Sequence, residues 1–196
     1  LIQSFKQVAV DQTGGERRTF GVASYIDEVL QSLHPHLKKS PIQIHVDCPP
    51  ELTMDSLPGA FSQVLTNLLS NAVKYNRRGG RVHLQVRRLA DGQAELRVQD
   101  TGLGLSESQM ASLFQPFNRL GREQGNIEGT GIGLVISRRL AELMGGTLHA
   151  ESMAGEGATF VLTLPLASDA PPGADPTAAG DPLAAPYRHR RVHYVE

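Results

Sequence analysis

The alternation of apolar and polar positions along the chain predicts one α+β domain over residues 18–167. Alternation such as that of Ile42, Ile44 and Val46 is typical of a half-buried strand. It predicts strands at about 17–22, 42–46, 52–55, 82–86, 94–98, 147–153 and 159–165. Apolar residues at helical spacing predict helices over about 24–39, with Ser24 as the expected N-cap, over 58–76, and from 134 to a stop at Gly145.

The helix predicted over residues 58–76 carries an unusual polar stripe. Asn67, Asn71 and Lys74 fall at i, i+4 and i+7, so they lie within roughly 60° of one another around the helix. Glu or Lys would serve solubility better, because Asn is the poorer helix former. An amide oxygen suits a hard cation such as magnesium, and a lysine can contact phosphate. The stripe is therefore either a solvated face or a site for a metal-bound phosphate.

Composition and charge exclude several classes of protein. A formal net charge of −1 over 196 residues gives no bulk attraction to nucleic acid. The chain has no signal peptide and no apolar run long enough to span a bilayer. We expect a cytoplasmic location, which leaves open a membrane anchor in a longer parent protein. Cys48 is the single cysteine, so an internal disulfide is impossible, and its extended surroundings make it a poor nucleophile.

Two glycine-rich stretches offer ligand chemistry. Asp100 comes where a strand ends, and Gly102 and Gly104 free the backbone there to approach a ligand closely. A carboxylate at that point can accept a hydrogen bond from an exocyclic amine, as on adenine. The glycine triplet at 129–133 precedes a helix, whose free N–H groups favour phosphate. Each stretch taken alone is also explained as an ordinary loop, and the polar segment before the triplet disfavours a dinucleotide fold.

Taken in order, four stretches resemble the nucleotide-binding boxes of sensor histidine kinases. They are NLLSNAVKY at 67–75, DTGLGL at 100–105, LFQPF at 113–117 and GTGIGL at 129–134, and GEGATF at 155–160 resembles a further glycine box. The resemblance covers about residues 18–166. It implies a Bergerat-type two-layer α/β sandwich, in which helices cover one face of a mixed, mostly antiparallel sheet. Gyrase and certain heat-shock and mismatch-repair ATPases share that fold.

The resemblance implies ATP and Mg2+ as cofactors and assigns roles to the residues of the boxes. Asn71 would bind magnesium, while Asn67 and Lys74 would act on the phosphates as the catalytic pair. Asp100 would accept a hydrogen bond from the adenine amine, with Tyr75 beside the base. The remaining implied contacts are Gly102, Gly104 and Leu105 around the base, Gly129, Thr130, Gly131, Gly133 and Leu134 at the phosphates, and Thr159 as a support from the sheet.

The polar segment 118–128 would be the lid over ATP, with Phe114 and Phe117 at its root. Arg119 would either contact the γ-phosphate or form a structural salt bridge. Taken singly, Tyr75, Phe114 and Phe117 are more often core residues than ligand contacts.

The chain departs from the resembled family at the phosphoacceptor. Sensor histidine kinases carry that histidine on an upstream helix, followed by an acidic residue and then, usually, Thr or Asn before Pro. No histidine here has that context; His34-Pro35-His36 is the nearest and lacks the acid. We therefore expect the acceptor before Leu1, and residues 1–17 to be the end of a dimerisation helix with its linker. The expected partners are that dimerisation and phosphoacceptor domain, in a homodimer, and a response-regulator receiver domain.

Three functions fit these patterns. The first is a protein-histidine kinase catalytic domain, which transfers the ATP γ-phosphate to a histidine outside the chain. The second is a Bergerat-type ATP hydrolase, but such relatives place a Glu base where Asn67 stands here, and an amide cannot act as that base. The third is a nucleotide-binding pseudokinase scaffold, which the intact Asn71, Lys74 and Asp100 oppose.

The last part of the chain changes character. Residues 168–187 are rich in Ala, Pro, Gly and Asp, which predicts a flexible linker. Residues 188–196 turn to basic and β-prone residues ending at Glu196, which resembles the opening strand of a receiver domain. The parent would then be a hybrid kinase. The alternative is an arbitrary tail.

Overall fold

The computed structural model describes residues 15–37, 41–118 and 131–167. Its elements in chain order are β1 (Arg18–Gly21), α2 (Val22–Leu37), β2 (Gln43–Asp47), β3 (Thr53–Ser56), α3 (Pro58–Lys74), β4 (Arg81–Arg88), β5 (Gln93–Asp100), α4 (Glu107–Ala111), α5 (Gly133–Leu143), β6 (Thr147–Met153) and β7 (Gly157–Pro165). The expected helix near the start of the chain, the linker over 168–187 and the strand-like segment over 188–196 lie outside the described residues.

Five strands form the main sheet in the order β2-β4-β5-β7-β6. Strands β2 and β4 pair in parallel, and the other neighbours pair antiparallel. A hairpin at Asp91-Gly92 joins β4 to β5, and Gly92 adopts φ +77° in it. The sheet is therefore mixed and mostly antiparallel, which confirms the predicted fold class.

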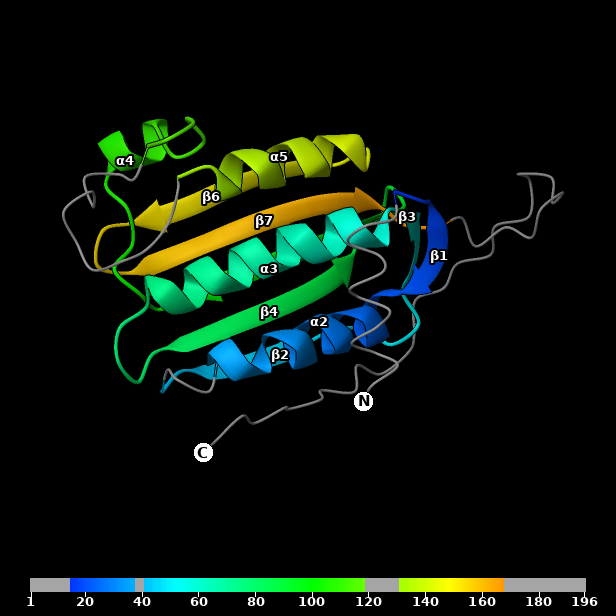
Figure 1. The fold of residues 1–196 in the computed structure, drawn as a ribbon, viewed down its shortest axis with the longest axis horizontal. Helices are drawn as coiled ribbons and strands as arrows, with labels where there is room; N and C mark the ends of the chain where they lie inside the picture. Colours follow the sequence, from blue (N-terminus) through cyan, green and yellow to red (C-terminus); the bar gives the residue numbers. More distant parts are fainter. Residues whose placement is uncertain (1–14, 38–40, 119–130, 168–196) are drawn as a thin grey trace, which may run out of the picture.

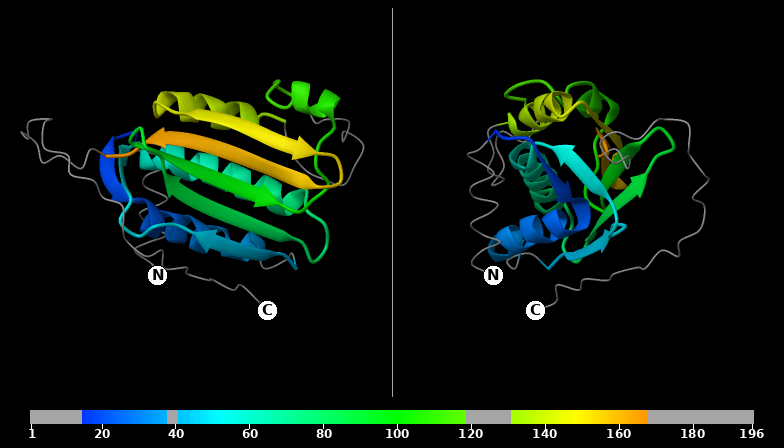
Figure 2. Two further views of the ribbon diagram at one scale, coloured as in Figure 1. Left: turned by 180° about the vertical axis from the view of Figure 1, so that it is seen from behind. Right: turned by 90° about the vertical axis from the view of Figure 1, so that its right-hand side faces the viewer.

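Helices α2, α3 and α5 lie side by side on one face of this sheet (Figure 1), and the views from behind and from the side leave the opposite face uncovered (Figure 2). The central helix α3 contributes its apolar side to the core, as its sequence pattern predicted. Its fully buried side chains include Phe61, Val64, Leu65, Leu68, Leu69 and Ala72. The buried residues of β4 and β5 alternate along each strand, whereas β7 is buried along most of its length, and these strands complete the core with the helix.

A second, two-stranded sheet pairs β1 with β3 antiparallel. The Val22 backbone N–H donates to the Leu52 carbonyl oxygen over 2.9 Å, so α2 begins directly after β1. The expected N-cap at Ser24 is therefore wrong: Ser24 lies inside α2, and its hydroxyl donates to the Gly21 carbonyl oxygen over 3.1 Å. The last described residue, Ala167, also reaches this sheet, because its N–H donates to the Thr53 carbonyl oxygen.

The short helix α4 has Ser106 as its N-cap. The Ser106 hydroxyl accepts from the Gln109 N–H, and the Gln109 side chain accepts from the Ser106 N–H, which forms a complete capping box. Among the described residues, no helix is both long and apolar enough to cross a membrane.

Candidate functional site

Asp100 ends strand β5 and lies buried, with 5% of its surface exposed. Its Oδ1 accepts hydrogen bonds from the backbone N–H groups of Gly102 (2.8 Å) and Ala158 (3.4 Å). Its Oδ2 accepts no hydrogen bond from any residue that the structure describes. Burial raises the pKa of this carboxyl above its usual value, and the two backbone hydrogen bonds oppose that rise. Two backbone N–H groups thus fix the Asp100 carboxylate through Oδ1, and Oδ2 remains available to a hydrogen-bond donor from outside the described residues.

Glycines give Asp100 this position. A Cβ on Gly157 would lie 2.0 Å from the Asp100 carbonyl oxygen, and one on Gly102 would lie 2.7 Å from the Asp100 Oδ1. Gly157 also adopts φ +94°, a backbone conformation that residues other than glycine rarely adopt. The turn between β6 and β7 therefore packs directly on the end of β5.

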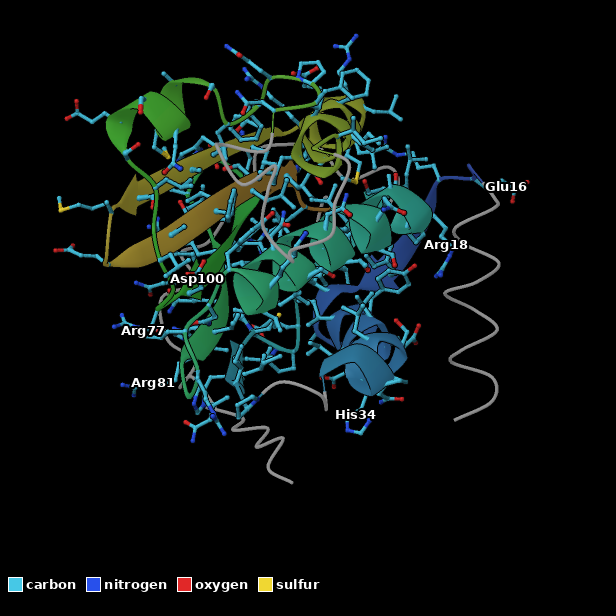
Figure 3. The ribbon with its side chains drawn as sticks, turned by 60° about the vertical axis from the view of Figure 1, so that its left-hand side comes forward. Glu16, Arg18, His34, Arg77, Arg81 and Asp100 are labelled. Carbon is cyan, nitrogen blue, oxygen red and sulfur yellow. The ribbon has the colours of Figure 1, made fainter. Side chains whose placement is uncertain are left out.

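The C-terminal end of α3 meets the same end of β5, where Figure 3 shows Asp100 beside that helix end. The Leu103 N–H donates to the Tyr75 carbonyl oxygen over 3.2 Å. The Lys74 Nζ lies 5.1 Å from the centroid of the Tyr75 ring, within range of a cation–π interaction. The segment that carries Lys74 and Tyr75 thus lies against the loop that follows the buried Asp100.

The loop after Asp100 is fixed by contacts with the β6–β7 turn. Gly104 adopts φ +63°, and a Cβ there would lie 2.0 Å from the Met153 carbonyl oxygen. Leu105 is buried, and its N–H donates to the Ser152 hydroxyl over 2.9 Å. Ser152 in turn donates to the Gly157 carbonyl oxygen over 2.7 Å. Ser152 therefore holds the loop and the turn together, although no motif in the sequence pointed to it.

The polar stripe of α3 divides into two kinds of residue. The Asn67 side-chain amide donates to the Gly133 carbonyl oxygen over 3.2 Å and to the Ser137 hydroxyl over 3.1 Å. Asn67 therefore joins α3 to the beginning of α5. The Asn71 side chain, one turn further along α3, makes no hydrogen bond with the described residues, so its amide oxygen is available to a ligand.

Helix α5 begins at Gly133 beside Asn67, and its first N–H groups have no partner within the helix. Leu134 packs against the core from this first turn. Just before the helix, Gly131 adopts φ +71°, and a Cβ there would lie 3.0 Å from the Phe117 carbonyl carbon and 3.1 Å from the Asn118 oxygen. Phe117, which the sequence left open to a core role, is 79% exposed.

Other predicted site residues lie apart or outside the described structure. Thr159 is buried on β7, paired with Gln99 next to Asp100, while the contact with the Asp100 carboxylate comes from the neighbouring Ala158 N–H. Gly129, Thr130, Arg119 and the lid predicted over 118–128 lie outside the described residues, apart from Asn118. A backbone donor such as Ala158 leaves no signal in a sequence, because every residue except proline can supply it.

The arrangement suits an elongated ligand. One end offers the free Asp100 oxygen and the Tyr75 ring, and the other offers the N-terminus of α5. Asn71 and Lys74 lie between them on α3. The described residues contain no group of three or more His, Cys, Asp or Glu side chains that could hold a metal by themselves.

Comparison with protein families matches residues 57–168 to the family described as histidine kinase-, DNA gyrase B-, and HSP90-like ATPase. The chain is 35% identical over 171 residues to the circadian input-output histidine kinase CikA of Synechococcus elongatus, covering 84% of this chain and 22% of CikA. It is 36% identical over 176 residues to the sensor protein GacS of Pseudomonas syringae pv. syringae, covering 84% of this chain and 19% of GacS. The chain thus spans about a fifth of the length of these two relatives.

The fold also matches the solved mycobacterial sensor histidine kinase MprB, with a TM-score of 0.68 and 24% identity, over 76% of this chain and 98% of that one. The family match covers more than half of the chain and includes the central helix, Asp100 and the start of α5. The chain therefore belongs to the histidine kinase-, DNA gyrase B-, and HSP90-like ATPases, as a catalytic ATP-binding domain of the sensor histidine kinase type.

Proposed function

We propose that this domain, over residues 18–167, binds ATP with its adenine at Asp100 and its triphosphate along Asn71 and Lys74 toward α5. In the parent protein the γ-phosphate then passes to a histidine outside this chain. The observation that carries the proposal is the state of Asp100. Its Oδ1 is held by two backbone N–H groups, and its Oδ2 is open among the described residues. An open carboxylate oxygen accepts a hydrogen bond from an amine, which adenine has at its edge and guanine replaces with a carbonyl oxygen.

The other end of the site supports a triphosphate. The N–H groups at the start of α5, which have no partner within the helix, and the Lys74 ammonium both favour negative charge. We assign Asn71 as the magnesium ligand, because its amide oxygen is a hard donor that makes no hydrogen bond with the described residues. Magnesium commonly takes one or two protein ligands and completes its shell with phosphate and water, so a lone Asn71 fits. The ion would neutralise charge on the phosphates.

Asn67 favours transfer over hydrolysis. Its two amide hydrogens are engaged by the Gly133 oxygen and the Ser137 hydroxyl. An amide cannot take a proton from water at neutral pH, so this position lacks the base that a hydrolase of this fold needs. The proposed acceptors and partners are the dimerisation and phosphoacceptor domain, in a homodimer, and a receiver domain, within a cytoplasmic part of the parent protein.

Calorimetric titration with ATP tests the base end of the site. Asp100→Asn keeps the shape of the side chain but replaces the charged acceptor. We expect it to weaken ATP binding by about tenfold or more, since hydrogen bonds to charged groups contribute more than neutral ones. Asp91→Asn is the matched control, because Asp91 lies in the β4–β5 hairpin and accepts from the Gln93 N–H. Equal ATP affinity in the Asp100 variant and the wild type would contradict the assignment.

A second assay tests the direction of phosphoryl transfer. Incubated with γ-labelled ATP, the chain should not label itself, because an acceptor must be held in line with the γ-phosphate. Steady-state hydrolysis should also be slow. Acid-labile phosphate at one equivalent on this chain, or rapid ATP turnover, would contradict the proposed transfer to an outside histidine.

A further inference from the structure

Asn76, directly after α3 and Tyr75, is half-buried and connects three segments of the chain. Its Oδ1 accepts from the Arg77 N–H over 2.9 Å and from the Thr101 hydroxyl over 3.3 Å. Its Nδ2 donates to the Arg81 carbonyl oxygen at the start of β4 over 3.1 Å. The end of α3, the start of β4 and the residue after Asp100 therefore share one amide side chain.

Thr101 is the second member of this arrangement. Its hydroxyl accepts from the Arg81 N–H over 2.9 Å while it donates to Asn76, and its own N–H donates to the Arg81 carbonyl oxygen over 3.1 Å. The Arg77 guanidinium Nε also donates to the Thr101 carbonyl oxygen. Figure 3 shows Arg77 and Arg81 at the same end of the domain as Asp100.

We infer that Asn76 and Thr101 are positioning residues for base recognition: their hydrogen bond fixes the distance between the Tyr75 ring and the Asp100 carboxylate. This inference rests on the proposed binding of adenine at Asp100. Asn76 is the next residue after Tyr75, and Thr101 is the next residue after Asp100. The hydrogen bond between Asn76 and Thr101 therefore connects the immediate neighbours of the two residues proposed to recognise the base.

The backbones of the two segments lie close together at Gly102. A Cβ on Gly102 would lie 2.4 Å from the Tyr75 carbonyl oxygen and 2.9 Å from the Asn76 Cα. The two segments thus approach as closely as backbone permits, and the side-chain pair sets their register. Loss of the pair leaves Asp100 on its strand but allows the Tyr75 segment to move relative to it.

The test measures ATP affinity by calorimetry on the whole chain, at a temperature where circular dichroism shows each variant folded. Thr101→Val keeps the shape and removes the hydroxyl, and Thr101→Ser restores the hydroxyl. We expect Thr101→Val and Asn76→Ala each to weaken ATP binding by about fivefold, the effect of one neutral hydrogen bond. Thr101→Ser should bind within about twofold of the wild type. The two losses should not multiply in the double variant, because both single variants remove the hydrogen bond between Asn76 and Thr101.

Thr147→Val is the matched control, since Thr147 is exposed at the start of the edge strand β6. If folded Thr101→Val binds ATP as well as the wild type does, the inference is overturned, whether or not Asn76→Ala folds. If Thr101→Ser binds ATP as weakly as Thr101→Val does, the hydroxyl at position 101 does not support ATP binding, and the inference is also overturned. A wild-type chain that fails to bind ATP would instead overturn the proposed function, and the inference with it.

Discussion

The Asn67 amide donates to the Ser137 hydroxyl over 3.1 Å, and this bond ties the middle of α3 to the first turns of α5. Ser137 is fully buried, so the bond satisfies a polar atom that water does not reach. The same amide reaches the Gly133 carbonyl oxygen, which lies at the N-terminus of α5. The two asparagines of the polar stripe thus differ in kind: Asn67 holds the fold around the phosphate end, and Asn71 faces no described partner.

This difference predicts opposite effects of two matched substitutions. Asn67→Ala should lower the free energy of unfolding by about 1–3 kcal/mol, since it removes the two hydrogen bonds that Asn67 donates to α5 and leaves the Ser137 hydroxyl without that donor. Asn71→Ala should leave it within about 0.5 kcal/mol of the wild type, and should weaken binding of ATP with magnesium. Urea unfolding of both variants measures the first effect. Because the helix propensity change is the same in both, equal stability losses would refute the structural role of Asn67.

Asp100 should make the domain less stable at neutral pH than its amide variant. Because burial raises the native pKa of Asp100 above the unfolded value, the native state binds the proton more tightly than the unfolded state does. The contribution of Asp100 to stability is therefore most favourable below the unfolded pKa and falls as pH rises through the native pKa. Asp100→Asn should raise the melting temperature at about pH 7, and the gain should shrink as pH falls toward about 4.

Thermal unfolding of the wild type and Asp100→Asn across that pH range measures this prediction. Asp91→Asn serves again as the control, because Asp91 lies in the exposed β4–β5 hairpin. A melting temperature of Asp100→Asn that falls below the wild type at neutral pH would show that the carboxylate stabilises the fold, contrary to this reasoning.

Two glycines of the β6–β7 turn allow a sharp test of how Asp100 is held. Gly155 and Gly157 both adopt positive φ (+87° and +94°), so an alanine at either position has a similar backbone strain. A Cβ on Gly155 meets nothing within 4 Å, whereas one on Gly157 would meet the Asp100 carbonyl oxygen at 2.0 Å. Gly157→Ala should therefore lose about 1–3 kcal/mol more stability than Gly155→Ala.

Only the Gly157 variant should also lose ATP affinity, because it displaces the end of β5. Denaturant unfolding and calorimetry on the two variants give both quantities. Equal behaviour of the two variants would mean that the β6–β7 turn yields without moving Asp100.

Cys48 should react slowly with alkylating reagents in the native protein. Burial, together with the nearby carboxylates of Asp47, Asp27 and Glu51, raises the pKa of its thiol to about 12. The thiolate is the reactive form, so iodoacetamide at about pH 8 should label native Cys48 at least about 100-fold more slowly than the urea-unfolded chain. Mass spectrometry over time measures both rates. Comparable rates would place Cys48 in a more open setting.

The sequence by itself determined the elements and the kinds of residue at the site. The strands of alternating pattern and the helix predicted over 58–76, observed as α3 (Pro58–Lys74), follow from local periodicity, which acts within a few residues. The resemblance of the ordered boxes also identified the family, because those stretches combine residue types whose chemistry suits a nucleotide.

Tertiary structure decided what these residues touch. Helix α2 begins before Ser24 because the Val22 N–H meets the distant Leu52 carbonyl oxygen, and no local pattern encodes that bond. Asn67 and Asn71 lie on the same face of α3. Only Asn67 forms hydrogen bonds with α5, because the packing of α5 against α3 brings Gly133 and Ser137 to Asn67. The second contact to the Asp100 carboxylate comes from a backbone N–H 58 residues away, on a strand that only the pairing of β5 with β7 brings beside it. Such contacts depend on the folded sheet, and any residue other than proline can donate them, so the residue types alone could not reveal them.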